Sequence, residues 1–355
     1  MSHPQTEDLH VRRIRPLISP AVLQEELPAG DTELALVSET RDAIGRILRG
    51  EDRRVLAIVG PCSIHDPVSA HEYAERLFAG TRDLTDDLLI VMRVYFEKPR
   101  TVVGWKGLIN DPHLDGSFAI NEGLRTARRV LRDVLEVGLP AGTEFLDTTF
   151  GQFYADLVSW GAIGARTAES QIHRELASGL SMPVGIKNRT DGDVQIAVDG
   201  IRAAGHKHLF PTLTKEGAPA IYETSGNADC HLILRGGPLS GPNYDAASVA
   251  DAAGRLAEHT LVPGIVVDCS HGNSNKDEQN QISVCNAVAE QIEAGSDVRG
   301  VMLESHLLAG NQSHAAGQPI DSLTYGLSIT DKCLALDDTL PLLRRLVEAA
   351  RGRPR

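Results

Sequence analysis

Short apolar segments that end at a polar residue recur along the chain. Val55–Val59 and Leu88–Met92 are typical, because both are continuously apolar, as in strands buried on both faces of a parallel sheet. A longer stretch of mixed polar and apolar residues then follows. We count eight such segments, and the other six are Pro140–Phe145, Gly161–Ala165, Pro183–Ile186, His231–Leu234, Gly264–Val267 and Gly300–Leu303.

Several stretches between these segments have the apolar spacing of amphipathic helices. The spacing is clearest in Glu122–Val137, Thr190–Ala204, Ala246–His259 and Asp277–Ala294. A strand followed by a helix, eight times in succession, predicts an α/β fold of the (β/α)8 TIM barrel type. An open doubly wound sheet is the alternative. Polar residues at all the strand ends favour the barrel, because only closure brings every end to one mouth.

Two parts of the chain fall outside this alternation. Residues 1–50 are predicted to form an N-terminal extension, in which the first thirty residues are largely extended and a helix runs from Asp31 to near Gly50. The catalytic barrel then occupies residues 51–355. Within it, two β-rich segments joined by a glycine-containing connection predict an inserted β-hairpin at about 206–226.

Composition narrows the class of protein. Of the 355 residues, 42% are hydrophobic and 23% are charged, which is typical of a soluble globular enzyme. The formal net charge of −13 argues against nucleic acid or an anionic membrane as a partner. No run of about eighteen apolar residues is present. The polar N-terminus has no signal-peptide core, so we expect a cytoplasmic protein. Five cysteines without a framework spacing indicate reduced thiols.

The segment after the second predicted strand concentrates positive charge. It contains Arg93 at the strand end and then, on a turn that proline stiffens, Lys98, Pro99, Arg100 and Thr101. Cations on a rigid turn beyond a buried parallel strand are well placed to hold an anionic ligand. A solvated basic loop is the alternative. Trp105 argues against it, because a purely solvated loop rarely contains tryptophan.

Potential metal ligands also follow the predicted strands or lie in a late loop. They are Cys62, His271, Glu304 and Asp331. One thiolate, one imidazole and two carboxylates form a borderline donor set that suits Mn, Fe, Co or Zn. No CxxC or HExxH spacing is present, and a single cysteine after a strand is usually just a small buried residue. The hypothesis therefore depends on the convergence of all four residues at one mouth.

Cations are expected at the same mouth. They are Arg93, Lys98, Arg166, Lys187 and Arg235. Cations this close repel one another unless anions compensate them, and two phosphates with one carboxylate would suffice. The alternative for each arginine is a structural ion pair with Asp or Glu. Arg166 follows small residues, from Gly161 to Ala165, that let backbone N–H groups approach a phosphate.

Long motifs cover these same regions. They are GPCSIHDP at 60–67, MRVYFEKPRTVVGWKGLINDPH at 92–113, WGAIGARTAESQIHRE at 160–175, PVGIKN at 183–188, ILRGG at 233–237, DCSHGNSNK at 268–276 and ESHLLAGNQ at 304–312. From about residue 10 to about residue 347 the chain resembles the type I 3-deoxy-D-arabino-heptulosonate-7-phosphate (DAHP) synthases, in the short subclass of the bacterial isoenzymes. The resemblance implies a metal-dependent transferase that condenses phosphoenolpyruvate with D-erythrose 4-phosphate and water. The products are DAHP and phosphate, in the first step of the shikimate pathway to aromatic amino acids.

The resemblance assigns roles to residues of this chain. The implied metal ligands are Cys62, His271, Glu304 and Asp331. The implied phosphoenolpyruvate contacts are Arg93, Lys98, Glu144, Ala165, Arg166, Lys187 and Arg235. The implied erythrose 4-phosphate contacts are Lys98, Pro99, Arg100 and Thr101. Catalysis is expected from Lys98, Glu144, Lys187 and His271, with the general acid and base left open among Glu144, Lys187, His271 and water held by the metal.

Two other functions stay open as alternatives. One is the related synthase that uses arabinose 5-phosphate, although the Lys98–Thr101 run and the GPCSIHDP motif favour the four-carbon sugar. The other is a catalytically silent barrel that acts only as an amino-acid sensor or partner subunit. The intact set of expected metal ligands argues against it.

The resemblance also implies feedback inhibition by an aromatic amino acid, and assembly into a homodimer or homotetramer. The expected effector site combines the N-terminal extension, the loop after the third strand and the hairpin, with Thr148, Gly151, Gln152, Leu180, Ser181, Phe210, Thr212 and Ile221. Relatives inhibited by phenylalanine or tyrosine tend to have proline where this chain has Gly151. The extra room favours tryptophan as effector, with tyrosine next. The alternative is that Gly151 is only a turn residue.

Overall fold

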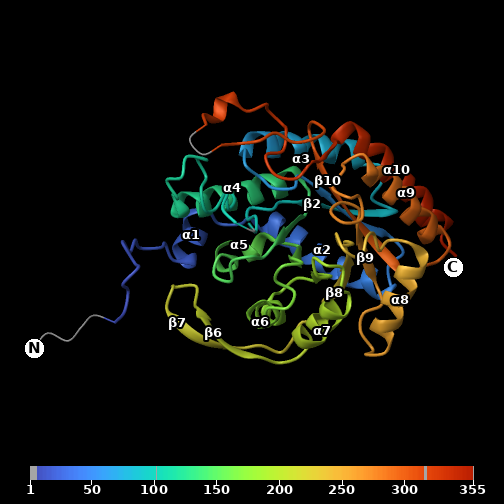
Figure 1. Ribbon diagram of the computed structural model, residues 1–355, viewed down its shortest axis with the longest axis horizontal. Coiled ribbons are helices and arrows are strands. Elements are labelled where there is room, and N and C mark those ends of the chain that lie inside the picture. Colours follow the sequence, from blue (N-terminus) through green and yellow to red (C-terminus); the bar gives the residue numbers. More distant parts are fainter. Residues whose placement is uncertain (1–5, 101, 316–317, 355) are drawn as a thin grey trace, which may run out of the picture.

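Eight parallel strands close into a barrel in the computed structural model, which describes residues 6–100, 102–315 and 318–354 (Figure 1). The strand order is β1-β2-β3-β4-β5-β8-β9-β10, and pairing of β1 with β10 closes the sheet. The strands are β1 (Val55–Gly60), β2 (Leu88–Arg93), β3 (Ala141–Glu144), β4 (Trp160–Ile163), β5 (Val184–Lys187), β8 (His231–Leu234), β9 (Ile265–Asp268) and β10 (Val298–His306). A short strand, β11 (Leu334–Ala335), pairs with the end of β10. The predicted TIM barrel is therefore confirmed.

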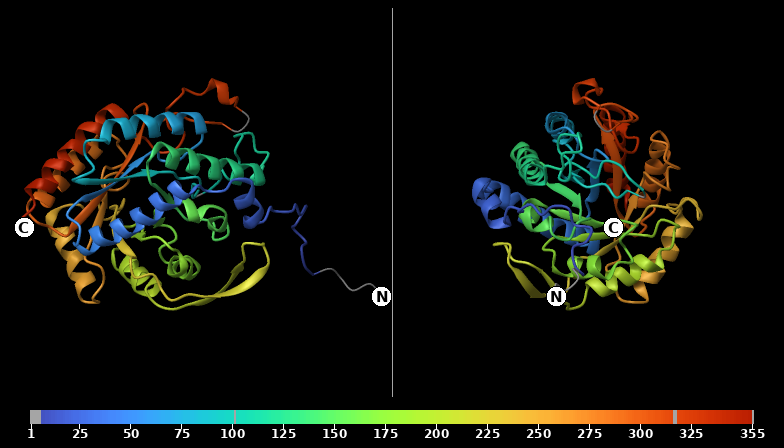
Figure 2. Two further views of the ribbon diagram at one scale, coloured as in Figure 1. Left: turned by 180° about the vertical axis from the view of Figure 1, so that it is seen from behind. Right: turned by 60° about the vertical axis from the view of Figure 1, so that its left-hand side comes forward.

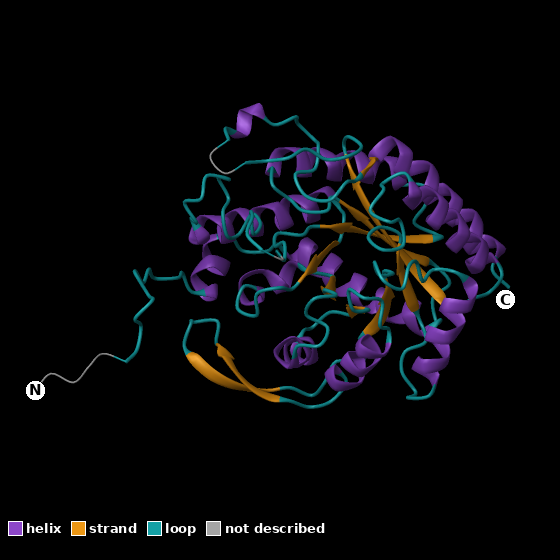
Figure 3. Ribbon diagram, viewed as in Figure 1, coloured by secondary structure: helices purple, strands orange, loops and turns teal. Residues whose placement is uncertain are grey.

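Helices surround the strands in all views (Figures 2 and 3). They are α3 (Pro67–Thr81), α4 (Ile120–Val137), α5 (Gly151–Tyr154), α6 (Gln171–Gly179), α7 (Gln195–Ala204), α8 (Ala246–Ala257), α9 (Asn280–Glu293) and α10 (Leu336–Gly352), with 3₁₀ turns η1 (Ala155–Leu157) and η2 (Ile320–Ser322). The prediction that a helix begins at Thr190 is wrong by five residues. Gly192 has a positive φ there, and Asp193 accepts a hydrogen bond from the Gln195 N–H, so a turn precedes α7.

The residues of each barrel strand alternate between two cores. In β1, Leu56 and Ile58 belong to the cluster inside the barrel, whereas Val55, Ala57 and Val59 pack in the layer between the strands and the helices. Both faces are apolar, which explains why the strand is continuously hydrophobic in the sequence.

The N-terminal extension contains a short helix that the sequence analysis did not expect. The expectation of a largely extended segment is wrong for α1 (Pro20–Glu26). The Ser19 hydroxyl accepts a hydrogen bond from the Val22 N–H at 3.4 Å. Pro20 occupies the first helical position, where its fixed φ suits a helix and its missing N–H costs nothing.

The second helix of the extension closes the N-terminal end of the barrel. This helix, α2 (Asp31–Arg49), ends as predicted at Gly50, which has the left-handed conformation typical of a helix C-terminus. Its side chains Ile44, Ile47 and Leu48 join the cluster inside the barrel. Because only a short turn separates α2 from the start of β1, the helix covers the strand starts and leaves the opposite end open.

The predicted hairpin is confirmed as a separate two-stranded antiparallel sheet, seen in yellow in Figure 1. Its strands are β6 (Leu209–Leu213) and β7 (Pro219–Glu223), with Phe210 opposite Tyr222. The Ala21 N–H of α1 donates to the Lys215 carbonyl at 2.7 Å, so the hairpin contacts the extension. Among the helices of the described residues, none has the length and apolar content needed to span a membrane.

Candidate active site

A cavity of about 540 Å³ opens at the C-terminal ends of the barrel strands. Its lining includes the predicted residues Cys62, Arg93, Lys98, Pro99, Arg100, Glu144, Ala165, Arg166, Lys187, Arg235, His271, Glu304 and Asp331. Thr101, predicted with them, lies outside the described residues. The cavity gathers residues as far apart in sequence as Cys62 and Asp331, which are separated by 269 positions.

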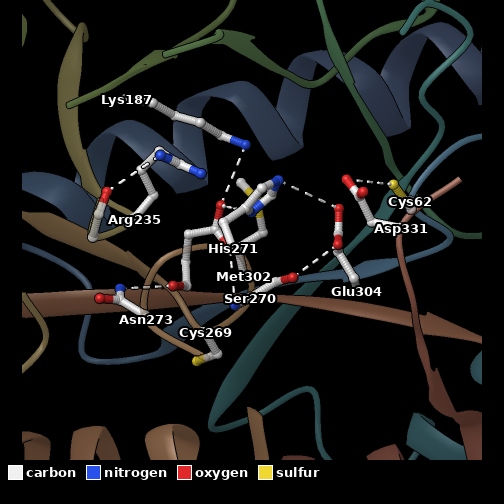
Figure 4. Close-up of polar contacts among 12 residues, drawn as sticks. Cys62, Lys187, Arg235, Cys269, Ser270, His271, Asn273, Met302, Glu304 and Asp331 are labelled. Atoms are coloured by element: carbon white, nitrogen blue, oxygen red, sulfur yellow. Dashed lines mark hydrogen bonds and ion pairs between the residues drawn. The ribbon is translucent and has the colours of Figure 1, made fainter. Parts of the chain in front are cut away.

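Potential metal ligands meet on one side of this cavity (Figure 4). Donor atoms of Cys62, Glu304 and Asp331 all lie within 4.8 Å of one another. His271 lies beside them, with its Nε2 3.8 Å from Glu304 Oε1. The Lys98 ammonium donates to Cys62 Sγ and to Asp331 Oδ2, both at 2.8 Å. A cation thus bridges two of the donors, and the mixed donor set fits a divalent transition metal.

Burial and neighbouring charges shift the pKa values of this group. Burial, with the nearby Glu304 carboxylate, raises the pKa of the Cys62 thiol to about 12. Burial disfavours the charged form of Lys98, but Cys62 and Asp331 outweigh it and raise the pKa of Lys98. Burial opposes ionisation of Asp331 too, but Lys98 outweighs it and lowers the pKa of Asp331. Lys98 and Asp331 therefore stay charged, whereas Cys62 needs a bound cation to lose its proton.

Asp268, the last residue of β9, holds the imidazole of His271. Its Oδ2 lies 2.9 Å from His271 Nδ1 and 3.3 Å from the Lys187 ammonium. Burial opposes the charge of Asp268, but His271 and Lys187 outweigh burial and hold the pKa of this carboxyl far below its usual range. A proton on Nδ1 leaves Nε2 free to face the donor set. The sequence analysis missed Asp268, although an aspartate that ends an apolar strand is a visible signal.

Glu144 and Lys187 face each other at another part of the cavity. The Lys187 ammonium lies 3.7 Å from Glu144 Oε2. A Cβ built on Gly164 would lie 2.5 Å from Glu144 Oε1, so a side chain there would displace the Glu144 carboxylate from this position. The small residues before Arg166 were expected to leave room for a phosphate, and the structure adds that Gly164 leaves room for Glu144.

The arginines of the cavity differ in their partners. Arg93 is buried and pairs with Glu304 Oε1 at 3.1 Å, and its guanidinium lies 4.0 Å from the centre of the Tyr95 ring. Arg235 is also buried, but its guanidinium donates to the carbonyl of Gly236. No carboxylate of the described residues forms an ion pair with Arg235 or with the exposed Arg166. These two arginines therefore lack the anion that Arg93 has.

Comparison with known proteins decides the family. The model of the DAHP synthetase I family matches residues 27–344. The chain belongs to this family, whose members are transferases. It is 54% identical to the Phe-sensitive phospho-2-dehydro-3-deoxyheptonate aldolase of Escherichia coli K12, covering 98% of this chain and 99% of that one. Identity and coverage are the same for the Trp-sensitive enzyme of Enterobacter agglomerans.

A more distant enzyme and a solved structure agree with this result. The tyrosine-inhibited phospho-2-dehydro-3-deoxyheptonate aldolase of Schizosaccharomyces pombe is 50% identical, covering 98% of this chain and 94% of that one. The solved structure of phospho-2-dehydro-3-deoxyheptonate aldolase from Francisella tularensis SCHU S4 superposes with a TM-score of 0.94. It is 49% identical, and the match covers 97% of this chain and 100% of that one.

This member of the DAHP synthetase I family has a further acidic residue in the cavity that sequence analysis missed. Glu97 is buried, and both of its side-chain oxygens accept from the Asp147 N–H, at 3.2 and 3.3 Å. Burial, with the nearby Asp147 carboxylate, raises the pKa of Glu97 to about 8. Within a charged loop, nothing in the sequence separates Glu97 from a solvated residue.

The residues expected to bind the effector lie where the hairpin approaches α5 and the end of α6. The Lys215 ammonium of the hairpin donates to the Gln152 carbonyl at 2.6 Å. A Cβ built on Gly179 would lie 4.0 Å from the ring of Phe210, which places the hairpin close to the segment that continues into Leu180 and Ser181. The other expected residues are Thr148 and Thr212, both partly buried, and Ile221, which is exposed.

Gly151 is helical, at the start of α5, and its φ is not positive. No positive φ requires glycine there, and the alternative that Gly151 is only a turn residue stays open. A Cβ at this position would lie 3.1 Å from the Phe145 ring. A larger residue would press on that aromatic side chain, so the absence of a side chain leaves Phe145 undisturbed.

Proposed function

We propose that this chain condenses phosphoenolpyruvate with D-erythrose 4-phosphate and water, giving 3-deoxy-D-arabino-heptulosonate 7-phosphate and phosphate. The observation that carries the proposal is one cavity in which Arg166 and Arg235, without carboxylate partners, lie beside a metal donor set. Such cations need anions, and the two substrates bring two phosphates and a carboxylate. Membership of the DAHP synthetase I family supports the same reaction.

The divalent metal would be held by Cys62, His271, Glu304 and Asp331, which suit Mn, Fe, Co or Zn. When bound, the metal supplies Lewis acidity that polarises the sugar aldehyde. The chain orients the donors beforehand, because Ser270 Oγ donates to Glu304 Oε2 at 2.8 Å and Asp268 faces the His271 imidazole. Donors held in this way lose little freedom when the cation arrives.

The cations of the cavity would anchor both substrates. Phosphoenolpyruvate would contact Arg93, Lys98, Glu144, Ala165, Arg166, Lys187 and Arg235, and erythrose 4-phosphate would contact Lys98, Pro99, Arg100 and Thr101. The planar guanidinium of Arg235 suits a bidentate bond to phosphate. The backbone of Arg235 is held in place, because the Arg235 N–H donates to Asn188 Oδ1 at 2.7 Å.

The proposed reaction has two stages. C3 of phosphoenolpyruvate attacks the aldehyde carbon, and C2 becomes oxocarbenium-like. Water then adds at C2, and phosphate leaves with cleavage of its C–O bond. We assign Glu144 as the base that takes the proton from water. It lies outside the metal donor set, and Glu97, the other such carboxyl group of the cavity, has a raised pKa and keeps its proton. Among the residues of the chain, Lys187 and His271 are the candidates that protonate the new alkoxide, and water held by the metal stays an open alternative.

One assay tests the reaction. The purified protein is mixed with phosphoenolpyruvate and either erythrose 4-phosphate or arabinose 5-phosphate, with a divalent metal or with EDTA. We expect a periodate-detectable product with erythrose 4-phosphate and metal, and no product with EDTA. Absence of product with erythrose 4-phosphate and metal contradicts the proposal, and product with arabinose 5-phosphate alone favours the alternative sugar.

A cysteine variant tests the metal site separately from turnover. Cys62→Ser removes the soft thiolate, so we expect weaker binding of Mn or Zn in a chelator competition. Cys230→Ser is the matched control, because Cys230 is also buried but lies outside the cavity. Equal metal affinity in the two variants would exclude Cys62 as a ligand.

We propose tryptophan as the inhibitory amino acid, with tyrosine next. Relatives of equal identity are named Phe-sensitive and Trp-sensitive, so identity by itself does not select the effector. The support is Gly151, where relatives inhibited by phenylalanine or tyrosine tend to carry proline. Initial rates with each aromatic amino acid at millimolar concentration test the proposal. Strong inhibition by phenylalanine or tyrosine without inhibition by tryptophan contradicts it.

A further inference from the structure

A lysine that the sequence analysis did not single out also lines the active-site cavity. Lys276 lies in the loop that follows β9, between that strand and α9. The residue is exposed and belongs to the lining of the cavity. The contacts proposed above give Lys276 no role, although two anionic substrates are expected to bind in this space.

Lys276 has no carboxylate partner among the described residues, although two acidic residues follow it directly. Asp277 Oδ1 accepts a hydrogen bond from the Gln279 N–H at 3.0 Å. Glu278 Oε2 lies 3.4 Å from the ammonium of Lys332. These neighbouring carboxylates therefore serve other contacts, and the Lys276 ammonium is left to an anion that enters the cavity.

The loop holds Lys276 in a conformation that is unusual for a residue with a side chain. Seven non-glycine residues of the described chain have a positive φ, and His271, Asn275 and Lys276 are three of them. The side-chain amide of Asn273 donates to the Asp268 carbonyl at 2.8 Å and so ties the loop to the end of β9. Strained backbone of this kind persists where the surroundings enforce it, and it is concentrated at ligand sites. The loop thus fixes the point from which the lysine side chain extends.

Lys276 lies on the side of the cavity where the metal ligands are proposed. Its N–H donates to the carbonyl of His271 at 2.9 Å. Its charge also acts on Asp331. Burial opposes ionisation of Asp331, but Lys98 outweighs it and lowers the pKa, with weaker contributions from His271 and Lys276. A cation that lines the cavity beside these ligands is therefore near any substrate that the metal holds.

The proposed reaction indicates which anion this lysine would meet. The aldehyde carbon of erythrose 4-phosphate is expected at the metal, and its phosphate is at the other end of a four-carbon chain. The phosphate of phosphoenolpyruvate already has Arg166 and Arg235. Seven lysines and arginines line the cavity against four aspartates and glutamates, so positive charge remains for a second phosphate.

We propose, on the basis of the proposed function, that Lys276 binds the phosphate group of the aldehyde substrate. A lysine contacts phosphate as a point charge on a flexible stem, which suits an exposed position at a cavity mouth. Arg100, from the loop after β2, is the expected partner at the same phosphate. Because this phosphate does not react, its contact with Lys276 strengthens substrate binding and acts on KM more than on kcat.

Steady-state rates of the full-length, metal-loaded enzyme test this contact. KM is measured for each substrate with the wild type, Lys276→Met, Lys276→Arg and Lys332→Met. Lys332 is the matched control, because it is exposed, pairs with Glu278 and does not line the cavity. We expect Lys276→Met to raise the KM for erythrose 4-phosphate by at least about tenfold, with less than about a twofold change in kcat and in the KM for phosphoenolpyruvate. Lys276→Arg should restore most of the loss, and Lys332→Met should match the wild type.

A binding measurement separates this contact from the reaction itself. Erythritol 4-phosphate has no aldehyde and cannot react, so it is titrated calorimetrically into protein that contains metal and phosphoenolpyruvate. We expect its affinity to fall by about tenfold in Lys276→Met and to stay unchanged in Lys332→Met.

The outcomes distinguish the two proposals. If the wild type makes no product, the proposed reaction is refuted, while weaker binding of erythritol 4-phosphate by Lys276→Met would still support the contact. If the wild type makes product, equal affinity of the wild type and Lys276→Met for erythritol 4-phosphate, or no binding by either, would overturn the contact alone. So would a rise in KM that is the same for both substrates.

Discussion

Two buried carboxyl groups near the active-site cavity have opposite pKa shifts, and their neighbours explain the difference. Asp268 lies 2.9 Å from His271 Nδ1 and 3.3 Å from the Lys187 ammonium, and these positive charges overcome burial. Glu97 is also buried but has Asp147 beside it and no cation, so its pKa rises. A carboxyl group without a cation keeps its proton in a dry site. Asp268 therefore acts as a fixed negative charge and Glu97 as a neutral acid.

Asn in place of Asp268 removes the charge that orients His271. We expect Asp268→Asn to weaken binding of Mn or Zn by about ten- to a hundredfold, because the imidazole loses the carboxylate that lies 2.9 Å from its Nδ1. Competition with a chelating dye measures this without any turnover. Asp338→Asn, at an exposed carboxylate of α10, is the control and keeps wild-type affinity. Equal affinities would show that His271 needs no partner.

We expect Glu97 to make the stability of the protein depend on pH. The folded-state pKa of about 8 lies above the ordinary 4.5, so folding favours the protonated form. Stability should then fall as pH rises through the window between these two values. From about pH 6 to about pH 8.5, the wild type should lose on the order of 2 kcal/mol more of its unfolding free energy than Glu97→Gln. Denaturant titrations at both pH values test this, and parallel losses in the two proteins would exclude Glu97 as the cause.

At the scale of secondary-structure elements, Lys215 connects the hairpin, α1 and α5, which are far apart in sequence. It lies in the turn of the β6–β7 hairpin. Its carbonyl accepts from the Ala21 N–H of α1, and its ammonium donates to the Gln152 carbonyl of α5. Burial lowers the pKa of Lys215, so the contact with a neutral carbonyl comes at some electrostatic cost. A single residue, through its backbone carbonyl and its side chain, thus connects the three elements expected to build the effector site.

Removing this ammonium should loosen the hairpin from α5 without touching the cavity. We expect Lys215→Met to keep the uninhibited rate and to raise the concentration of aromatic amino acid that gives half-inhibition by several-fold. The physical reason is that the effector must then order the elements itself. Rates across an effector titration measure this. Lys207→Met is the control, because Lys207 lies before β6, is exposed and pairs with Glu223. If both variants respond to the effector as the wild type does, the contact has no regulatory role.

At the scale of the whole molecule, the fold places the last loop against the first strand. The Cys62 N–H donates to Cys333 Sγ at 3.4 Å, although 271 positions separate the two residues. Both thiols are buried and free. Burial raises the pKa of each, to about 12 for Cys62. Both thiols are therefore protonated near neutral pH, and a protonated thiol is a poor nucleophile.

Loss of the metal should expose this pair to oxidation. In metal-free protein kept in air, we expect a Cys62–Cys333 disulfide, formed as two thiols give two electrons and two protons to oxygen, with loss of activity that a thiol reductant restores. Peptide mapping identifies the bond. Metal-loaded protein and Cys333→Ser should both resist inactivation. Free thiols at both positions in the inactive protein would contradict this prediction.

The sequence by itself determined the barrel, the hairpin, the end of α2 at Gly50 and most of the residues that line the cavity. These features depend on local patterns: apolar runs, turn residues, and polar groups directly after strands. The prediction failed at Pro20–Glu26, where proline suggested extended chain, because at the first helical position proline favours a helix.

Only the tertiary structure decided which charged side chains lie next to one another and which are buried. It placed Lys98 between Cys62 and Asp331, set Asp268 between His271 and Lys187, and buried Glu97. The physical reason is that pairing, burial and pKa depend on distances between residues remote in sequence. Barrel closure fixes those distances, and no local pattern in the chain encodes them.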